Sequence, residues 1–154
     1  RLDAQMLLLL AMGRDMNDRA WLLAHDTDPL PAGADERFTE RVRRRLAGAP
    51  VAYLAGAKAF FGLQLQVDPR VLVPRPDTEI LVETAERALR AMPLHRSLTA
   101  LDLCCGSGII GVSLARRIAN LAVTAVDVSN EATEMTAHNA RKNDVSARLR
   151  RLLP

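Results

Sequence analysis

The sequence predicts an α/β protein in which a helical N-terminal part precedes a part with alternating strands and helices. In the first fifty residues, apolar side chains recur at helical spacing. The stretch Leu63-Gln-Leu-Gln-Val67 then changes to the two-residue period of a half-buried strand. From residue 98 onward, short apolar runs alternate with helical segments, which is the order of a parallel sheet with crossover helices.

The composition is that of a globular protein. Hydrophobic residues make up 49% and charged residues 25% of the 154 positions, but aromatic residues only 3%, so the core must consist mainly of Leu, Val, Ile and Ala. The net charge of +3 permits an acidic partner without requiring nucleic acid. The basic run Arg41-Val-Arg-Arg-Arg45 has no interleaved aromatic residues, and we interpret it as a solvated helix face.

The cysteines and the flanking sequence indicate the compartment. Cys104 and Cys105 are adjacent, which suits neither a disulfide framework nor a zinc site, so we expect no metal and a reducing, cytoplasmic setting. The apolar run from Met6 to Met12 is too short to span a bilayer and predicts a buried helix. Because the chain starts at Arg1, we expect an incomplete N-terminus.

Three helices are expected in the N-terminal part, over residues 2–12, 19–25 and 35–47. Gly13 ends the first, and Asn17 or Asp18 can cap the second. In the third, we expect one apolar face at four-residue spacing, formed by Phe38, Val42 and Leu46.

A hairpin and a proline-rich segment follow. Residues 57–61 can pair with residues 63–67 across Gly62, and residues 71–73 form another extended stretch. Pro74 and Pro76 forbid regular structure around them. A helix then runs from Asp77 or Thr78 to about Ala91, and we expect its inner face to include Ile80, Leu81, Thr84 and Ala88.

The C-terminal part reads as strand, turn, helix, strand and helix. The strands are residues 98–103 and 122–126, and the helices are residues 109–118 and a segment that Ser129 caps and that ends near Asn143. The stub at residues 147–153 is left for a third strand.

The motif Leu101-Asp-Leu-Cys-Cys-Gly-Ser-Gly108 places a glycine turn between a strand and a helix. Glycines let the backbone approach a ligand, and the N–H groups at the helix start attract its polar or anionic end. We therefore expect a ligand-binding loop that includes Cys104, Cys105, Gly106, Ser107 and Gly108.

Asp127 ends the next strand, where a carboxylate can accept hydrogen bonds from both hydroxyls of a ribose. The order of the elements favours this role over that of a simple turn residue that caps the following helix.

The same glycines match a dinucleotide fingerprint, so a nicotinamide enzyme is the rival interpretation. Asp102 separates the two, because a carboxylate before the glycines repels a pyrophosphate but attracts the ammonium of S-adenosylmethionine. At about 4 Å and an effective dielectric of 20, such a pair is worth about 4 kcal/mol. The charge favours S-adenosylmethionine, although Asp102 could also merely cap a strand end.

The second motif is Val71-Leu-Val-Pro-Arg-Pro-Asp-Thr-Glu79. Acidic residues are favoured at a helix start by the helix dipole alone. A rigid lid over a ligand is the functional alternative, with Arg75, Pro76, Thr78 and Glu79 as its candidate residues. Physical chemistry alone leaves both open.

These two motifs, together with Phe60-Phe-Gly-Leu63, closely resemble the release factor glutamine methyltransferases over essentially the whole chain. The resemblance implies a class I methyltransferase domain of the Rossmann-like kind, with S-adenosylmethionine as cofactor and a peptide chain release factor as protein substrate. The chain departs from the family's Gly-Thr-Gly-Thr/Ser-Gly loop at Cys104 and Cys105, and it has Pro76-Asp-Thr-Glu79 where the family has Pro-Glu-Thr-Glu.

The family's catalytic signature, Asn-Pro-Pro-Tyr, does not occur in the 154 residues, so we expect no catalytic residue in this chain and no activity from it alone. Without that motif, two alternatives stay open: an amino-group methyltransferase acting on nucleic-acid adenine, and a non-catalytic nucleotide-binding fragment. The same motif downstream of Pro154 would settle the class.

The resemblance also suggests how the chain is divided. Residues 1–54 are expected to form a helical domain that recognises the protein substrate, because one glutamine side chain offers too little surface for selection. Residues 55–73 would be a β-hairpin linker, and residues 74–154 an incomplete domain that binds S-adenosylmethionine. Binding to a membrane or directly to nucleic acid is not expected.

Overall fold

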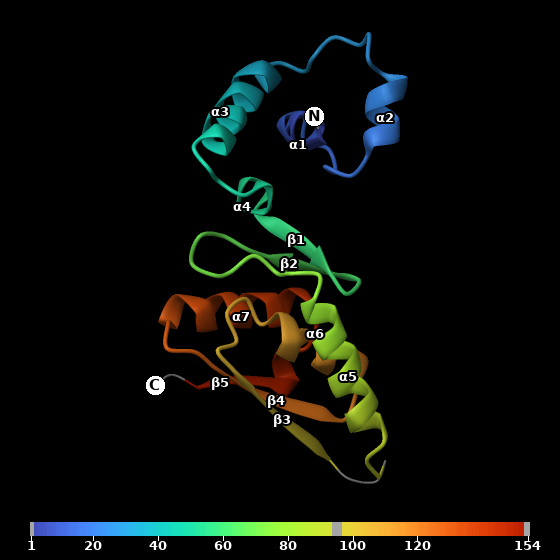
Figure 1. Ribbon diagram of the computed structural model, residues 1–154, viewed down its shortest axis with the longest axis vertical. Coiled ribbons are helices and arrows are strands. Elements are labelled where there is room, and N and C mark those ends of the chain that lie inside the picture. The colour runs from blue at the N-terminus through green and yellow to red at the C-terminus, as the bar shows by residue number, and fades with distance from the viewer. Residues whose placement is uncertain (1, 94–96, 153–154) are drawn as a thin grey trace. The chain divides into compact units, whose positions relative to one another are not determined.

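A computed structural model describes residues 2–93 and 97–152. The chain divides into two compact units, Arg1–Gly56 and Ala57–Pro154, which are considered separately (Figure 1). Within the described ranges, no helix is both long enough and apolar enough to cross a membrane.

The first unit consists of four helices: α1 (Leu2–Ala11), α2 (Arg19–Ala24), α3 (Ala34–Leu46) and α4 (Val51–Ala55). The Asp18 side chain caps α2 by accepting a hydrogen bond from the Trp21 amide at 3.2 Å, as the sequence predicted. The apolar residues buried in this unit are small or aliphatic: Leu7, Leu9, Ala11, Ala34, Ala52 and Leu54.

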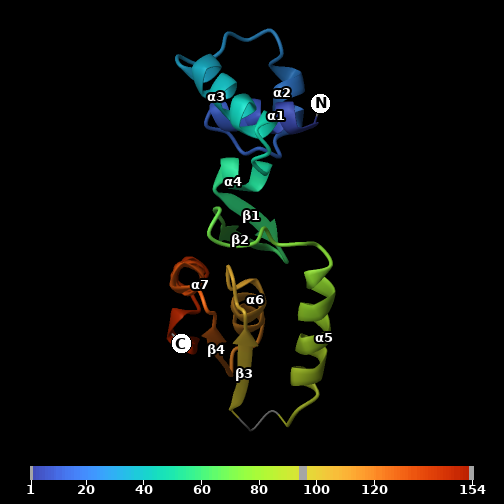
Figure 2. The ribbon, with the colours of Figure 1, turned by 60° about the vertical axis from the view of Figure 1, so that its left-hand side comes forward.

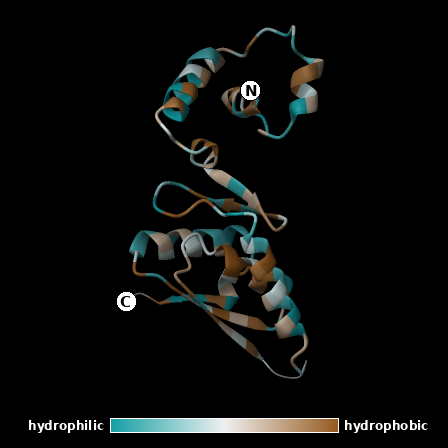
Figure 3. Ribbon diagram, in the orientation of Figure 1, coloured by the Kyte–Doolittle hydropathy of each residue, from teal (hydrophilic) through white to brown (hydrophobic). Residues whose placement is uncertain are grey.

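Two details of this unit differ from expectation. The short helix α4 was not predicted, because five residues are too few to show a helical period. The expected apolar face of α3 is wrong at its end, since Leu46 is 84% exposed while Phe38 and Val42 are half-buried. The C-terminal turn of α3 is instead tied to α1 by an ion pair between Arg45 and Asp3, and Figure 3 shows hydrophilic colour over much of this helix.

The second unit begins with the predicted hairpin, formed by β1 (Ala57–Phe60) and β2 (Leu63–Gln66) in antiparallel register. Phe61 and Gly62 connect the strands with φ values of 48° and 78°, as a tight two-residue turn requires. Residues 71–73 form no strand, but Val71 is buried.

The helix α5 (Thr78–Arg90) lies where it was predicted, but its expected inner face is only partly right: Leu81 and Ala88 border an apolar cavity that residues 100–103 also line, whereas Ile80 and Thr84 are exposed. Ile80 and Leu81 are 66% and 53% exposed, and the buried positions are Val82 and Glu86. Glu86 turns inward because it forms ion pairs with Arg117 of the neighbouring helix and with Arg90. The hydrogen bond from Arg117 lowers the pKa of Glu86, although burial acts in the opposite direction.

The parallel sheet has the order β3–β4–β5, from strands β3 (Leu98–Leu103), β4 (Leu121–Val126) and β5 (Leu149–Leu152). The helices α6 (Ile109–Arg117) and α7 (Asn130–Lys142) are the crossovers, and a 3-10 turn at Ser146–Arg148 precedes β5. These elements confirm the predicted α/β class, and the short C-terminal stub does form a third strand. Figure 2 shows α6 and α7 between the hairpin and the sheet.

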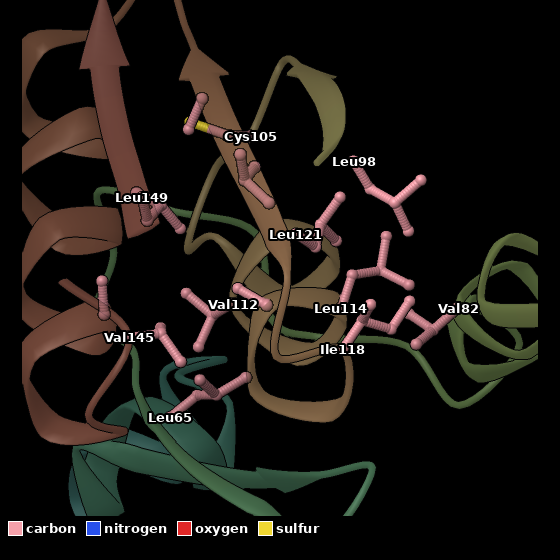
Figure 4. Close-up of a cluster of buried hydrophobic side chains, with 14 of the residues drawn as sticks. Leu65, Val82, Leu98, Cys105, Val112, Leu114, Ile118, Leu121, Val145 and Leu149 are labelled. Atoms are coloured by element: carbon pink, nitrogen blue, oxygen red, sulfur yellow. The ribbon is translucent and has the colours of Figure 1, made fainter. Parts of the chain in front are cut away.

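One hydrophobic cluster joins the sheet, its helices and the hairpin (Figure 4). Along β4, side chains alternate between buried and more exposed positions, so the face of the sheet towards the helices carries Leu121, Val123 and Ala125. Leu65 of the hairpin and Val82 of α5 are fully buried in the same cluster. The cluster therefore fixes the glycine loop's flanking elements, β3 and α6, against the rest of the unit.

Candidate functional site

The site lies at the carboxyl ends of β3 and β4, which are neighbouring parallel strands. The predicted loop at residues 104–108 follows β3, and Asp127 follows β4. The structure brings them together: the Gly106 amide donates a hydrogen bond to Oδ2 of Asp127 at 2.9 Å. The other oxygen, Oδ1, accepts from the Ser129 amide at 3.0 Å. Each carboxylate oxygen has a second lone pair, so Asp127 retains acceptor capacity for a ligand.

The loop follows a left-handed path that explains its glycines. The φ values are 56° at Gly106 and 78° at Gly108, a region that residues with a Cβ adopt only under strain. A Cβ at Gly106 would meet no atom within 4 Å, so the backbone there is open to a ligand. A Cβ at Gly108 would lie 2.9 Å from Thr136 of α7, so close packing of the loop on that helix requires glycine.

Cys104 and Cys105 have different environments. Cys105 is buried in the hydrophobic cluster, where Figure 4 shows its sulfur, and burial raises the pKa of its thiol. Its sulfur lies within hydrogen-bond distance of the Thr136 hydroxyl oxygen, at 3.4 Å. Cys104 is exposed and has a φ of 59°. It is the strained residue of this loop, at the position where the resemblance predicts glycine.

We therefore expect Cys104→Gly to stabilise the protein. The left-handed conformation costs a residue with a Cβ roughly 1–2 kcal/mol, and glycine removes this cost. Glycine also has more conformational freedom in the unfolded chain, which cancels about 0.4–1 kcal/mol of the stability gained. The free energy of unfolding should rise by up to about 1.5 kcal/mol in urea titrations. Cys105→Gly is the matched control and should lower it, because its side chain is buried. A loss of stability in Cys104→Gly equal to that of the control would contradict this account.

Asp102 is buried beside the start of α6. It is 7% exposed, and its Oδ2 accepts a hydrogen bond at 2.9 Å from the amide of Gly111, in the first turn of α6. A Cβ at Gly111 would lie 2.9 Å from the same oxygen. Burial raises the pKa of Asp102, and the hydrogen bond from Gly111 opposes that shift. The contact shows that Asp102 anchors the start of α6.

The proline-rich segment lies beside the glycine loop. Both segments line a cavity of about 190 Å³. The proline-rich segment contributes Leu72, Val73, Pro74, Arg75 and Thr78, the glycine loop contributes Cys104, Cys105, Gly106 and Ser107, and α6 contributes Ile109 and Ile110. Asp127 is not among the lining residues. Asp102 lines a different, apolar cavity between α5 and β3.

Two of the four candidate lid residues lie elsewhere. Pro76 and Glu79 do not line this cavity, and the Glu79 carboxylate accepts a hydrogen bond from the Phe61 amide at 3.0 Å. Glu79 therefore holds the hairpin turn against the start of α5, whereas Arg75 and Thr78 border the cavity.

Asn139 of α7 was missed by the sequence analysis. It is fully buried, and its Oδ1 accepts a hydrogen bond from the Gln66 amide at 2.7 Å. Its Nδ2 donates to the carbonyls of Gln66 at 3.0 Å and Ser107 at 2.9 Å. One side chain thus joins the hairpin, the glycine loop and α7. The sequence did hold one signal, since Thr133, Thr136 and Asn139 recur at three-residue spacing and so share one helix face. In the structure all three are fully buried.

Two family models match the chain. Residues 1–56 match the PrmC N-terminal domain, and residues 77–152 match the methyltransferase small domain. The boundary after residue 56 coincides with the division between the two structural units.

Curated relatives cover almost the whole chain. This chain is 45% identical over 150 residues to the release factor glutamine methyltransferase of Bordetella pertussis. The matched region covers 97% of this chain and 53% of that protein. The proteins of the same name from Burkholderia pseudomallei and Chlorobaculum tepidum are 43% and 41% identical, over 92% and 97% of this chain. The chain spans about half the length of these relatives.

Solved structures resemble the fold at lower identity. A SAM-dependent methyltransferase from Agrobacterium tumefaciens superimposes with a TM-score of 0.52 at 20% identity, over 62% of this chain and 31% of that one. The M. jannaschii tRNA m1G37 methyltransferase gives a TM-score of 0.50 at 19% identity, over 64% of this chain and 29% of that one. At these identities the likeness establishes the fold alone.

Proposed function

Because the chain belongs to the release factor glutamine methyltransferase family, we propose that the whole protein methylates the side-chain amide of a glutamine in a peptide chain release factor. The methyl donor would be S-adenosylmethionine, and the cytoplasm would be the site of action. The observation that carries the proposal is the junction of the glycine loop with Asp127 at the ends of two parallel strands.

The residues at this junction fit the donor. The open backbone at Gly106 permits close approach of a ligand, and the spare lone pairs of Asp127 can accept the ribose hydroxyls. The exposed thiol of Cys104 and the residues Ser107, Gly108 and Cys105 would complete the loop around the donor. Asp102 would attract the donor's ammonium through its charge while it anchors α6. When bound, S-adenosylmethionine supplies an electrophilic methyl group on its sulfonium sulfur.

Arg75 and Thr78 would border the donor from the proline-rich segment, since they share a cavity with the glycine loop. Pro76 and Glu79 would act indirectly, Glu79 through the hairpin turn that it holds. In this arrangement the segment excludes water from one side of the donor. The catalytic group that positions the glutamine amide would come from the Asn-Pro-Pro-Tyr motif that the resemblance implies.

Calorimetric titration of S-adenosylmethionine tests the site. Asp127→Ala should weaken binding roughly ten- to hundredfold, because a hydrogen bond to a charged group contributes about 1.5–3 kcal/mol. Glu131→Ala removes an equal charge from the nearby start of α7 and is the matched control, with affinity expected close to that of the unchanged chain. Equal affinities for both variants, or tighter binding of NAD than of S-adenosylmethionine, would refute the proposal.

Methyl transfer itself is tested with tritium-labelled S-adenosylmethionine as the donor. A purified release factor and duplex DNA are offered as acceptors in parallel reactions. Label on a glutamine of the release factor is the expected result for the whole protein. Label on adenine in DNA would instead identify a nucleic-acid methyltransferase and overturn the substrate assignment.

A further inference from the structure

Cys104 is the exposed thiol of the glycine loop, whereas the neighbouring Cys105 is buried. Both line the cavity of about 190 Å³ that the loop shares with the proline-rich segment. A thiolate exchanges with a disulfide only where the reagent can reach it, so exposure counts as much as chemical reactivity. Cys104 is therefore the thiol of this pair that can react with a disulfide from solution.

Two polar side chains on the same cavity have no partner within the described residues. Arg75 is the only charged residue among the described lining residues, and its side chain forms no ion pair or hydrogen bond within residues 2–93 and 97–152. Ser107 is 3% exposed, and its hydroxyl likewise has no partner in these ranges. The Ser113 hydroxyl, by contrast, is fully enclosed. The Ser107 hydroxyl keeps access to the cavity, where an anionic oxygen can accept its hydrogen bond.

The first turn of α6 contributes backbone donors to the same place. The amides of Ile109 and Ile110, which also line the cavity, have no acceptor in the described part of the chain. The next amide, that of Gly111, already donates to Asp102. Free amides at a helix start attract anions, and a guanidinium pairs well with a carboxylate. The cation, the hydroxyl and the two amides, with no acidic side chain among the described lining residues, suit a carboxylate next to the Cys104 thiol.

We propose that Cys104 is a modification site, where a small disulfide that carries carboxylates, of the glutathione class, forms a mixed disulfide. The Cys104 thiol first gives its proton to solvent. Its thiolate then attacks one sulfur of the small disulfide, so that a new S–S bond forms, the old one breaks, and the leaving thiolate takes a proton from solvent. The small disulfide is the oxidant, and the carboxylate of the retained half lies at Arg75, Ser107 and the α6 amides.

The mixed disulfide should control donor binding reversibly. The adduct occupies the space between the glycine loop and the proline-rich segment, so it excludes S-adenosylmethionine until a dithiol reductant removes it. This consequence rests on the proposed function, whereas the modification site itself does not. The family's usual loop has glycine at the position of Cys104, so the modification is a property of this chain.

The test incubates the 154-residue chain with oxidised glutathione and locates the adduct by tandem mass spectrometry, which should find it on Cys104 rather than Cys105. Arg75→Gln should slow the reaction about two- to fivefold, as expected for the loss of an exposed charge pair. The same variant should slow the reaction with uncharged hydroxyethyl disulfide by less than about twofold. Arg87→Gln removes an equal charge from an exposed position of α5 outside the cavity and is the matched control, with little effect on either reagent.

An adduct on Cys105, or none at all, would overturn the proposal, as would equal slowing of both reagents by Arg75→Gln. Circular dichroism checks that the variants fold. In a chain that binds S-adenosylmethionine before treatment, the adduct should lower the affinity by about tenfold or more, and dithiothreitol should restore it. Unchanged affinity would overturn the control of donor binding. Calorimetry on the untreated chain judges the proposed function separately, because a chain that binds no donor contradicts that function while the position of the adduct still decides the modification site.

Discussion

Replacing Asn139 with alanine is expected to lower the free energy of unfolding by about 2–4 kcal/mol. The substitution removes three hydrogen bonds at once and leaves the Gln66 amide and carbonyl and the Ser107 carbonyl without their partner. A buried polar group that loses its partner costs about 1–3 kcal/mol. Since a domain is stable by only about 5–15 kcal/mol, this one side chain accounts for a large fraction of the total.

Urea denaturation followed by circular dichroism measures the effect. Asn143→Ala is the matched control at the C-cap of α7, where the partly exposed side chain donates to the Asn139 carbonyl at 2.9 Å and lies 3.4 Å from the Gln64 carbonyl. It should cost less than about 1 kcal/mol. Asn139→Asp retains an acceptor for the Gln66 amide but places a carboxylate against two carbonyls, so it should not restore stability. A cost for Asn139→Ala no larger than for Asn143→Ala would show that these hydrogen bonds are energetically minor.

The position of Asn139 also explains how the hairpin can influence the glycine loop. Gln66 ends β2 and Ser107 lies within the loop, and the same amide nitrogen binds both carbonyls. The Thr136 hydroxyl, one turn earlier on α7, donates to the Gly106 carbonyl at 3.1 Å. The carbonyls of Gly106 and Ser107 are thereby turned towards α7.

Local chemistry made much of this fold predictable. Asp18 and Ser129 cap helices as expected, because a cap depends only on neighbouring residues. The Phe61-Gly62 turn and the alternation in β2 fixed the hairpin for the same reason. The meeting of the glycine loop with Asp127 follows from the parallel order of β3 and β4, which the alternation of strands and helices already implied.

The sequence-based predictions fail where contacts between residues far apart in the sequence determine which side chains are buried. The inner face of α5 is set by the ion pair between Glu86 and Arg117, a contact across 31 positions that hydrophobic spacing cannot reveal. The hydrogen bond from the Gly111 amide to Asp102 was likewise not predictable, because it joins residues nine positions apart on a strand and a helix. Asn139 was overlooked because a polar residue within a helix usually faces solvent, and its partners lie 73 and 32 positions away.

The close packing of Gly108 against Thr136 leads to an expected loss of about 2–5 kcal/mol of unfolding free energy for Gly108→Ala. A left-handed φ costs a residue with a Cβ roughly 1–2 kcal/mol, and forcing an extra carbon into a packed contact adds about 1–3 kcal/mol. At Gly108 both costs apply, because φ is 78° and the new Cβ would lie 2.9 Å from Cγ2 and Oγ1 of Thr136. The clash involves a fully buried β-branched side chain, which has few rotamers to escape into.

Gly106→Ala provides the matched control within the same loop. Its φ of 56° imposes the backbone cost, but a Cβ there meets nothing within 4 Å, so the loss should be only about 1–2 kcal/mol. Urea denaturation of the two variants therefore separates conformational strain from steric contact. In a double-mutant cycle, Thr136→Ala should relieve part of the cost of Gly108→Ala, with a coupling of about 1 kcal/mol. Equal losses for the two glycine variants and additive behaviour with Thr136→Ala would mean that the contact with α7 does not restrict the loop.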